Sequence, residues 1–112
     1  MTTSDTFVSY LIDQLAPFGA VSPRRMFGGC GLFRDGLMIA LIADETLYLK
    51  ADAACRTDFE AAGAIPFTYL RAGKRVALSY LSVPAEVLDD RDALSSWAEA
   101  AFAAARRSAR HR

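Results

Sequence analysis

Residues 24–51 constrain the fold more than any other stretch, because two turn signals divide them into short apolar segments. Residues 37–43 (LMIALIA) form an unbroken apolar run that is too short for a typical helix and suits a buried strand. Before this run, Arg34-Asp35-Gly36 carries the Asp-Gly pair typical of a two-residue hairpin turn. After it, a polar break at residues 44–46 leads into residues 47–50, where leucines alternate with Tyr and Lys. This stretch therefore predicts a β-meander.

The glycine cluster Gly28-Gly29-Cys30-Gly31 allows two interpretations. One is a loop that cradles a phosphate, which requires a following helix and usually a lysine with a serine or threonine. The other is a bulge, a bend or a close backbone approach within a sheet. Because a predicted strand segment, Leu32-Phe33, follows the glycines, the sheet interpretation is favoured.

Amphipathic helices are predicted before, between and after the strands. Apolar residues recur on one side of each segment, so each needs a surface to cover. The last helix carries Trp97 in its apolar stripe, and we expect this ring to anchor the helix against the sheet. The predicted ranges and N-caps are residues 4–16 with Ser4, 52–62 with Asp52, about 90–107 with Asp90, and a short turn of helix at 84–88.

A second hairpin is predicted from residues 66–70 and 75–81, with residues 71–74 as its turn. It should join the first sheet, since an isolated hairpin is marginally stable in water. The expected fold class is a two-layer α+β domain. Its antiparallel sheet has five to six strands, flanked by N-terminal, middle and C-terminal helices (α-β3/4-α-β2-α) that pack mainly on one face. Residues 1–112 are one domain by size, with residues 106–112 as a mobile basic tail.

Several segments together resemble the N-terminal domain of the TfoX/Sxy family of bacterial competence regulators, over about residues 7–105. The resemblance implies a small α+β domain with an antiparallel sheet, a link to regulation of DNA-uptake genes, and no catalytic site. Two-domain members continue into a helical C-terminal domain, whereas this sequence stops at Arg112, so we expect a standalone N-terminal domain. The matching segments are RRMFGGCGLF at 24–33, LYLKAD at 47–52, PFTYL at 66–70, LSYLSVP at 78–84, and the late helix with Leu94 and Trp97.

The charge balance argues against nucleic-acid binding through net charge alone, because 13 basic and 13 acidic side chains give a formal net charge of zero.

Cys30 and Cys55 lie far apart without a CxxC motif, so we expect buried, inert thiols rather than a disulfide or redox pair. One histidine and two cysteines are too few for a typical zinc site, and we expect no metal or cofactor. The chain lacks a signal-peptide pattern and a membrane-length apolar run, which predicts a cytoplasmic protein.

Seven residues are candidates for contact with a partner or an anion. If the two hairpins are neighbours, their five cations share one edge of the sheet; the alternative is a set of solvated turns with local ion pairs to Asp35, Asp44 and Glu45. The candidates are Arg24, Arg25, Gly28 and Gly29 near the first hairpin, and Arg71, Lys74 and Arg75 at the second.

Three other groups each have a functional and a structural interpretation. The tail at 106–112 (RRSARHR) is either an arm that grips phosphates or a helix end whose arginines suit the helix dipole. The carboxylates Asp89, Asp90 and Asp92 are explained as capping groups rather than cation ligands, and His111 has no partner for a triad. Aromatic residues on the predicted strands either stack bases or belong to the core and interfaces: Tyr10, Tyr48, Tyr69, Tyr80, Phe27, Phe33 and Phe67.

The favoured function is a non-enzymatic regulatory domain that docks a protein partner, with transcription machinery as the candidate partner. The alternatives are a direct nucleic-acid binder that uses the arginine clusters, and a small ligand-binding domain at the glycine-rich bend. Residues 37–43 are apolar on both faces of the predicted strand, and helices on one face would leave the other face exposed to water. We therefore also expect the open face or an edge of the sheet to meet a second copy.

Overall fold

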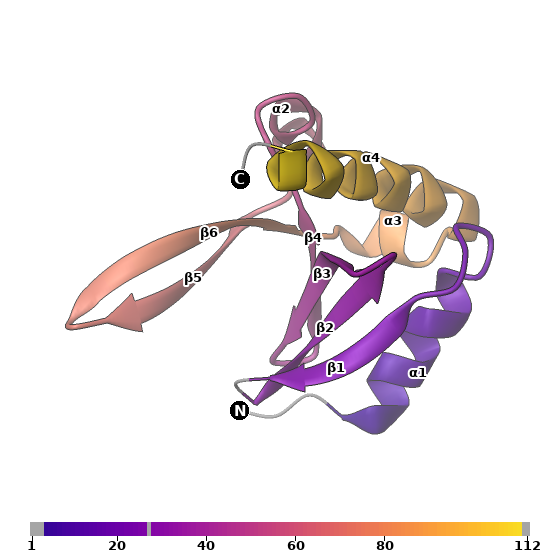
Figure 1. Cartoon of the computed structure of the whole chain (residues 1–112), viewed down its shortest axis with the longest axis horizontal. Coiled ribbons are helices and arrows are strands. Elements are labelled where there is room, and N and C mark those ends of the chain that lie inside the picture. The colour runs from indigo at the N-terminus through magenta and orange to yellow at the C-terminus, as the bar shows by residue number, and fades with distance from the viewer. Residues whose placement is uncertain (1–3, 27, 111–112) are drawn as a thin grey trace.

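The computed structural model describes residues 4–26 and 28–110, and within them it shows the expected α+β architecture (Figure 1). All six strands form one antiparallel sheet in the order β1-β2-β3-β4-β6-β5. The strands are β1 (Ser22–Met26), β2 (Gly29–Arg34), β3 (Leu37–Ala43), β4 (Thr46–Lys50), β5 (Pro66–Arg71) and β6 (Lys74–Ser82). The helices are α1 (Asp5–Gln14), α2 (Arg56–Ala61), α3 (Ala85–Leu88) and α4 (Arg91–Arg110).

The predicted meander is confirmed, and β3 has the predicted bounds. Asp35 and Gly36 both have positive φ values, 53° and 78°, as a primed two-residue turn between β2 and β3 requires. Asp44 and Glu45 repeat this geometry between β3 and β4, with φ values of 57° and 59°. Short local turns therefore set the register of three consecutive strands.

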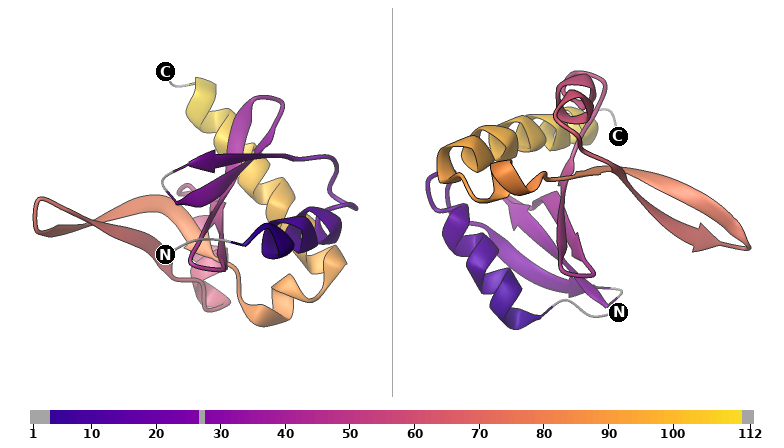
Figure 2. Two further views of the ribbon diagram at one scale, coloured as in Figure 1. Left: turned by 90° about the horizontal axis from the view of Figure 1, so that it is seen from below. Right: turned by 180° about the vertical axis from the view of Figure 1, so that it is seen from behind.

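The core lies between one face of the sheet and the helices α1 and α4 (Figure 2). Leu32, Ile42 and Leu49 share this face and are fully buried. Leu41 points to the opposite face, yet it is only 8% exposed. The central residues of β3 are thus buried on both faces within a single chain, and the apolar run at 37–43 no longer requires a second copy.

The glycine cluster is explained by close packing within the sheet. A Cβ added at Gly29 would lie 2.3 Å from the backbone oxygen of Ile42 on β3. A Cβ at Gly31 would lie 3.1 Å from side-chain atoms of Met26 and Phe33. Because backbone and side chains occupy the space beside both glycines, the sheet interpretation is confirmed and the phosphate loop is not supported.

Helix boundaries confirm two predicted caps and correct one. The Ser4 Oγ accepts a hydrogen bond from the Phe7 N–H at 3.1 Å, and the Asp90 Oδ1 accepts from the Ala93 N–H at 3.1 Å. Asp52 does not cap α2, because that helix begins at Arg56, after a turn that follows Asp52.

The last helix adds two features to its prediction. The ring of Trp97 stacks on Phe59 of α2, with centroids 4.2 Å apart, so it joins α2 to α4, and it also packs against the core on the sheet. Helix α4 continues to Arg110, three residues beyond its predicted end. Mobility of residues 106–112 in solution stays a prediction, and His111 and Arg112 lie outside the described residues.

The second hairpin joins the sheet, as predicted, but only at its base. Residues Tyr80, Leu81 and Ser82 of β6 pair with β4, and the Ser79 carbonyl accepts from the Ala51 N–H just after β4, while residues 74–77 of β6 pair with β5. Residues 66–79 therefore project from the body as a two-stranded ribbon, which we call the arm (Figures 1 and 2). Among residues 4–26 and 28–110, no helix has the length and apolar character required to cross a membrane.

Candidate functional site

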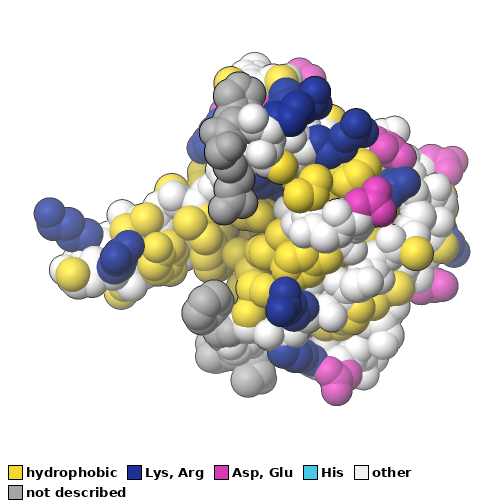
Figure 3. Space-filling model, viewed as in Figure 1, with side chains coloured by type: hydrophobic (Ala, Val, Ile, Leu, Met, Phe, Trp, Pro, Cys, Tyr) yellow, Lys and Arg dark blue, Asp and Glu magenta, His cyan; other side chains and the backbone are white. Residues whose placement is uncertain are grey.

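The sheet surface opposite the helices, here called the open face, gathers apolar side chains from four strands. Strand register places Gly31 of β2 beside Leu41 of β3, Leu41 beside Tyr48 of β4, and Lys50 of β4 beside Tyr80 of β6. Side chains of Met26, Phe33 and Met38 surround the position of Gly31 on this face. Figure 3 shows hydrophobic side chains collected there and along the adjoining surface of the arm.

Aromatic rings connect the open face to the arm. The Tyr48 ring meets Phe67 of β5 edge to face, with centroids 5.1 Å apart. Phe67 is in turn 6.4 Å from Tyr69, further along β5. These rings form part of the predicted aromatic group, whereas Tyr10 stacks with Phe7 on α1 and Phe27 lies outside the described residues.

Cations lie over two rings of the open face. The guanidinium carbon of Arg24 is 5.8 Å from the centroid of Phe33, and the Lys50 Nζ is 5.3 Å from the centroid of Tyr80. The Tyr80 hydroxyl donates to the Met38 carbonyl at 3.4 Å, and burial raises the pKa of this phenol. The tyrosine therefore carries no charge at physiological pH. The positive charge of this surface comes from Arg24 and Lys50.

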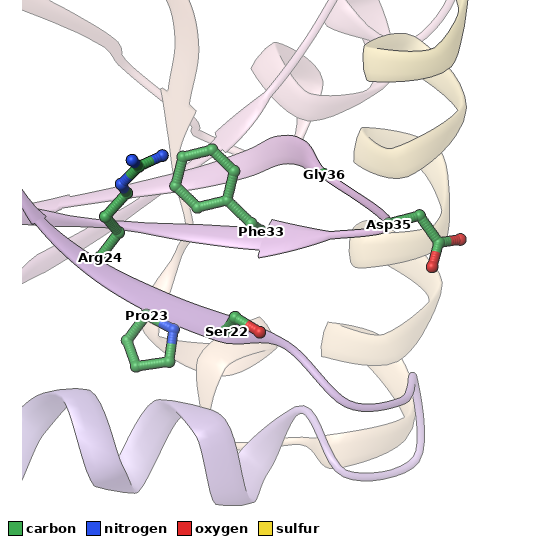
Figure 4. Close-up of a pocket in the computed structure, with 6 residues that line it drawn as sticks. All are labelled: Ser22, Pro23, Arg24, Phe33, Asp35 and Gly36. Carbon is green, nitrogen blue, oxygen red and sulfur yellow. The ribbon is translucent and has the colours of Figure 1, made fainter.

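A shallow hollow of about 400 Å³ lies at the β1 end of this surface. In Figure 4, Arg24 and Phe33 rise to one side of the sheet from neighbouring strands, while Pro23 points to the other side. Arg24 and Asp35 are its charged lining residues, and the remaining lining is Ser22, Pro23, Phe33 and Gly36. The hollow therefore offers one cation and one carboxylate beside an aromatic ring.

The structure does not bring the five predicted cations together. β1 and β5 are the two outer strands of the sheet, so Arg24 and Arg25 lie at the end opposite to the arm. Arg25 points away from the open face and pairs with Asp5 at the start of α1. The shared cationic edge is therefore wrong, because β3 and β4 separate the two hairpins.

The remaining cations of this predicted group occupy the tip of the arm. Arg71 and Lys74 flank its turn, and Arg75 donates from a guanidinium nitrogen to the Thr68 Oγ1 at 2.9 Å. None of the three forms an ion pair with a described carboxylate. Residues 61–85 contain these three cations and no Asp or Glu, so the arm is locally positive on a chain with no net charge.

Comparison with known proteins identifies the family. Residues 13–105 match the family model described as the TfoX N-terminal domain. The chain belongs to the TfoX N-terminal domain family. It is also 31% identical over 65 residues to DNA transformation protein TfoX1 of Aliivibrio fischeri (strain ATCC 700601 / ES114). That alignment covers 58% of this chain and 31% of the relative, so this chain corresponds to less than two thirds of that longer protein.

The TfoX N-terminal match includes every strand of the sheet and therefore the whole open face and the arm. It places the chain in a competence-related family. The two cysteines, Cys30 and Cys55, are free and buried, as expected. Burial raises the pKa of Cys55, which keeps this thiol protonated.

Sequence reasoning missed Arg34, which is the most enclosed cation–aromatic contact in the described residues. Its guanidinium carbon lies 4.5 Å from the Phe18 ring and 4.8 Å from the Phe102 ring. It also donates to the Phe18 carbonyl at 3.3 Å. This side chain ties β2 to α4 and to the segment after α1. Only the neighbouring Asp-Gly turn marked it in the sequence.

Two arginines near the C-terminus, Arg106 and Arg107, contact residues of the fold. Arg107 donates through Nε to Asp52 Oδ2 at 2.6 Å and through a terminal nitrogen to Oδ1 at 2.9 Å. This bidentate bond holds the pKa of Asp52 below its usual value. Arg106 lies over Phe102, with its guanidinium carbon 5.6 Å from the centroid. Truncation at residue 106 would therefore damage packing as well as remove charge.

Proposed function

We propose that this chain is a non-enzymatic regulatory domain that binds a protein partner on its open face. The observation that supports this role is the apolar surface of β2, β3, β4 and β6 (Figure 3), which none of the described helices covers (Figure 2). Monomeric soluble proteins rarely leave a large contiguous apolar surface without a use. Membership of a competence-related family supports a regulatory role for such a surface.

The chemistry of the open face indicates what kind of partner segment it takes. Its centre is apolar and polarisable, because the side chains of Met26, Phe33 and Met38 meet above Gly31. Methionine side chains adapt to different partner shapes. Arg24 and Lys50 place positive charge beside this centre. A partner segment with leucine or aromatic anchors and nearby carboxylates is complementary to it, and transcription machinery remains our candidate source of that segment.

The experiment begins with a photo-crosslinking amino acid at Phe33, compared with the same label at Thr57 on the exposed side of α2. In cells that naturally carry the chain, a partner specific to the Phe33 label is expected. Functional consequence is tested by complementation of a deletion strain with the double variant Phe33→Ser and Met38→Ser. Transcripts of DNA-uptake genes should fall to the level of the deletion strain, while Thr57→Ser should restore them.

Two results would contradict the proposal. One is identical crosslinked products from the Phe33 and Thr57 labels. The other is full complementation by the double variant, provided that circular dichroism and thermal melting show that it is folded. Either result would mean that the open face is not the working surface.

A second candidate function is direct contact with nucleic acid, favoured by the arm tip with Arg71, Lys74 and Arg75. The DNA major groove admits a two-stranded β-ribbon, and these cations lack carboxylate partners among the described residues. Three phosphate contacts predict a slope of about −3 for log affinity against log salt on random duplex DNA. Replacement of all three by alanine should abolish this slope, whereas Arg56→Ala should leave it unchanged.

A further inference from the structure

The outer strand β5 is protected only at its ends, by Pro66 and Arg71 and by an irregular register between Pro66 and Thr68. Natural sheets shield their edges with proline, charge, bulges or a covering element. β1, the other outer strand, carries Pro23 and two arginines and lies beside α1 (Figure 1). In β5, by contrast, residues 67–70 (FTYL) contain no charge, glycine or proline. Such an edge is a template for pairing with another strand.

The most exposed large apolar side chains flank the same edge. Ile65 is 67% exposed and Leu70 is 66% exposed, on a ribbon that projects from the body (Figures 1 and 2). Leu78, on the neighbouring strand, is 37% exposed. An isolated two-stranded ribbon is only marginally stable in water, so an additional strand would stabilise the arm.

The turn at the tip determines which backbone groups face outward. Ala72 and Gly73 both have positive φ, 52° and 78°, and Arg71 pairs with Lys74 across this two-residue turn. Residues that flank such a turn bond to each other, and hydrogen-bonded and non-hydrogen-bonded pairs then alternate along the hairpin. The N–H and C=O groups of Thr68 and Leu70 consequently point away from β6, toward the free edge.

From this pattern we infer that β5 pairs antiparallel with β5 of a second copy about a twofold axis at Tyr69. This register places Leu70 of each copy opposite Thr68 of the other. The outward N–H and C=O groups of Thr68 and Leu70 in both copies are then hydrogen-bonded. Pro66, which has no N–H, falls opposite Ala72 at the turn, where no ladder bond is needed.

The side-chain chemistry of β5 suits pairing with a second copy. The pairing sets Arg71 of each copy opposite Phe67 of the other, on the same face of the joined sheet, which creates two cation–aromatic contacts. The two Arg71 residues themselves lie at opposite ends of the paired segment. The twofold pair of Tyr69 rings extends the row of Tyr48 and Phe67, so the two open faces become one surface across a twelve-stranded sheet.

Disulfide trapping tests this register directly. In this register Tyr69 lies opposite Tyr69 of the second copy as a non-hydrogen-bonded pair. The Cα atoms of such a pair lie about 4.5 Å apart, within the range that a disulfide spans. Tyr69→Cys should form a covalent dimer under mild oxidation. Thr57→Cys, at an exposed position on α2, should remain monomeric. The native Cys30 and Cys55 are buried, so the wild-type protein gives the background level of crosslinking.

A second variant tests the interface without a new thiol. Wild-type protein should sediment at twice its 12.2 kDa mass at high concentration. Leu70→Lys should weaken the dimer at least about tenfold, equivalent to about 1.4 kcal/mol. Because Leu70 is exposed in the single chain, this change should leave the monomer folded. Tyr10→Lys, at a large exposed side chain on α1, is the matched control and should not alter the dimer.

The inference is overturned if the wild-type protein stays at 12.2 kDa throughout a dilution series, or if Tyr69→Cys crosslinks no better than Thr57→Cys. It is also overturned if Leu70→Lys and Tyr10→Lys dissociate alike. None of these outcomes affects the open face, since a monomer that still binds its partner through Phe33 would leave the proposed function intact.

Discussion

At the scale of single residues, Arg34 shows how one cation joins three segments of the chain. Its guanidinium lies over the rings of Phe18 and Phe102, which meet edge to face, and its side chain is 30% exposed. A cation over two rings in this partly desolvated position contributes about 2 kcal/mol. Arg34→Ala should lower the free energy of unfolding by about that amount, measured by urea denaturation with Trp97 fluorescence.

Arg24 provides the matched control for Arg34. It also lies over a ring, that of Phe33, but at 5.8 Å on an exposed surface. Arg24→Ala should therefore change stability by no more than about 0.5 kcal/mol. Arg34→Lys should fall between the two, since lysine keeps the charge but loses the planar stack. Equal losses from Arg34→Ala and Arg24→Ala would contradict this account of the contact.

Asp52 leads to a prediction about pH. Its bond with Arg107 lowers the carboxyl pKa in the folded state relative to the unfolded state. The stabilisation is therefore present above the unfolded pKa and is lost as pH falls through the folded pKa. The two side chains are 30% and 40% exposed, so solvent screening limits it to about 1 kcal/mol at most.

The test is the stability difference between wild type and Asp52→Asn across a pH series. The variant should be less stable at pH 7, and the difference should shrink in acid below the ordinary carboxyl pKa, where wild type loses its bond as well. A difference that stays constant with pH would assign the effect to packing rather than to charge.

At the scale of elements, the β2–β3 pair depends on a glycine that no other residue replaces. A Cβ at Gly29 meets the Ile42 backbone oxygen at 2.3 Å, and two paired strands cannot yield as a side chain does. Gly29→Ala should therefore cost about 3 kcal/mol, the upper end for overpacking. At Gly31 the nearest atoms are the ends of flexible side chains, so Gly31→Ala should cost only about 1 kcal/mol. Thermal melting of both variants checks the order, and a reversed order would refute the close-approach explanation.

Local signals predicted the elements well, because each is encoded within a few residues. The Asp35-Gly36 turn and the apolar run at 37–43 were sufficient for β3, and Ser4 and Asp90 marked the starts of helices. Asp52 misled for a physical reason. Its carboxylate does accept a bond from the Ala54 N–H at 3.1 Å, but this bond closes a turn, and α2 begins only at Arg56.

At the scale of the whole molecule, sequence reasoning was limited by contacts between distant segments. The apolar stripe of α4 was evident, yet the stacking of Trp97 on Phe59 depends on how α2 folds back. The second hairpin was evident too, but its pairing with β4 through only three residues of β6 depends on where β4 ends at Lys50. The predicted cationic edge failed for the same reason, since strand order separates the hairpins.

The arm and the body should therefore be separable in energy. Within the arm, the two strands pair with each other, and the described ring contact with the body is that of Phe67 with Tyr48. Tyr69 and Val76 form a hydrogen-bonded pair across the ribbon, so an Asn-Gly turn can replace residues 70–75 and close a shorter hairpin. The shortened chain should keep its Trp97 fluorescence and unfold within about 1 kcal/mol of wild type, because the core is untouched. It should also lose dimerisation and any salt-dependent DNA binding, while the Phe33 crosslink on the open face persists. A large loss of stability in urea would show instead that the arm is part of the folding unit.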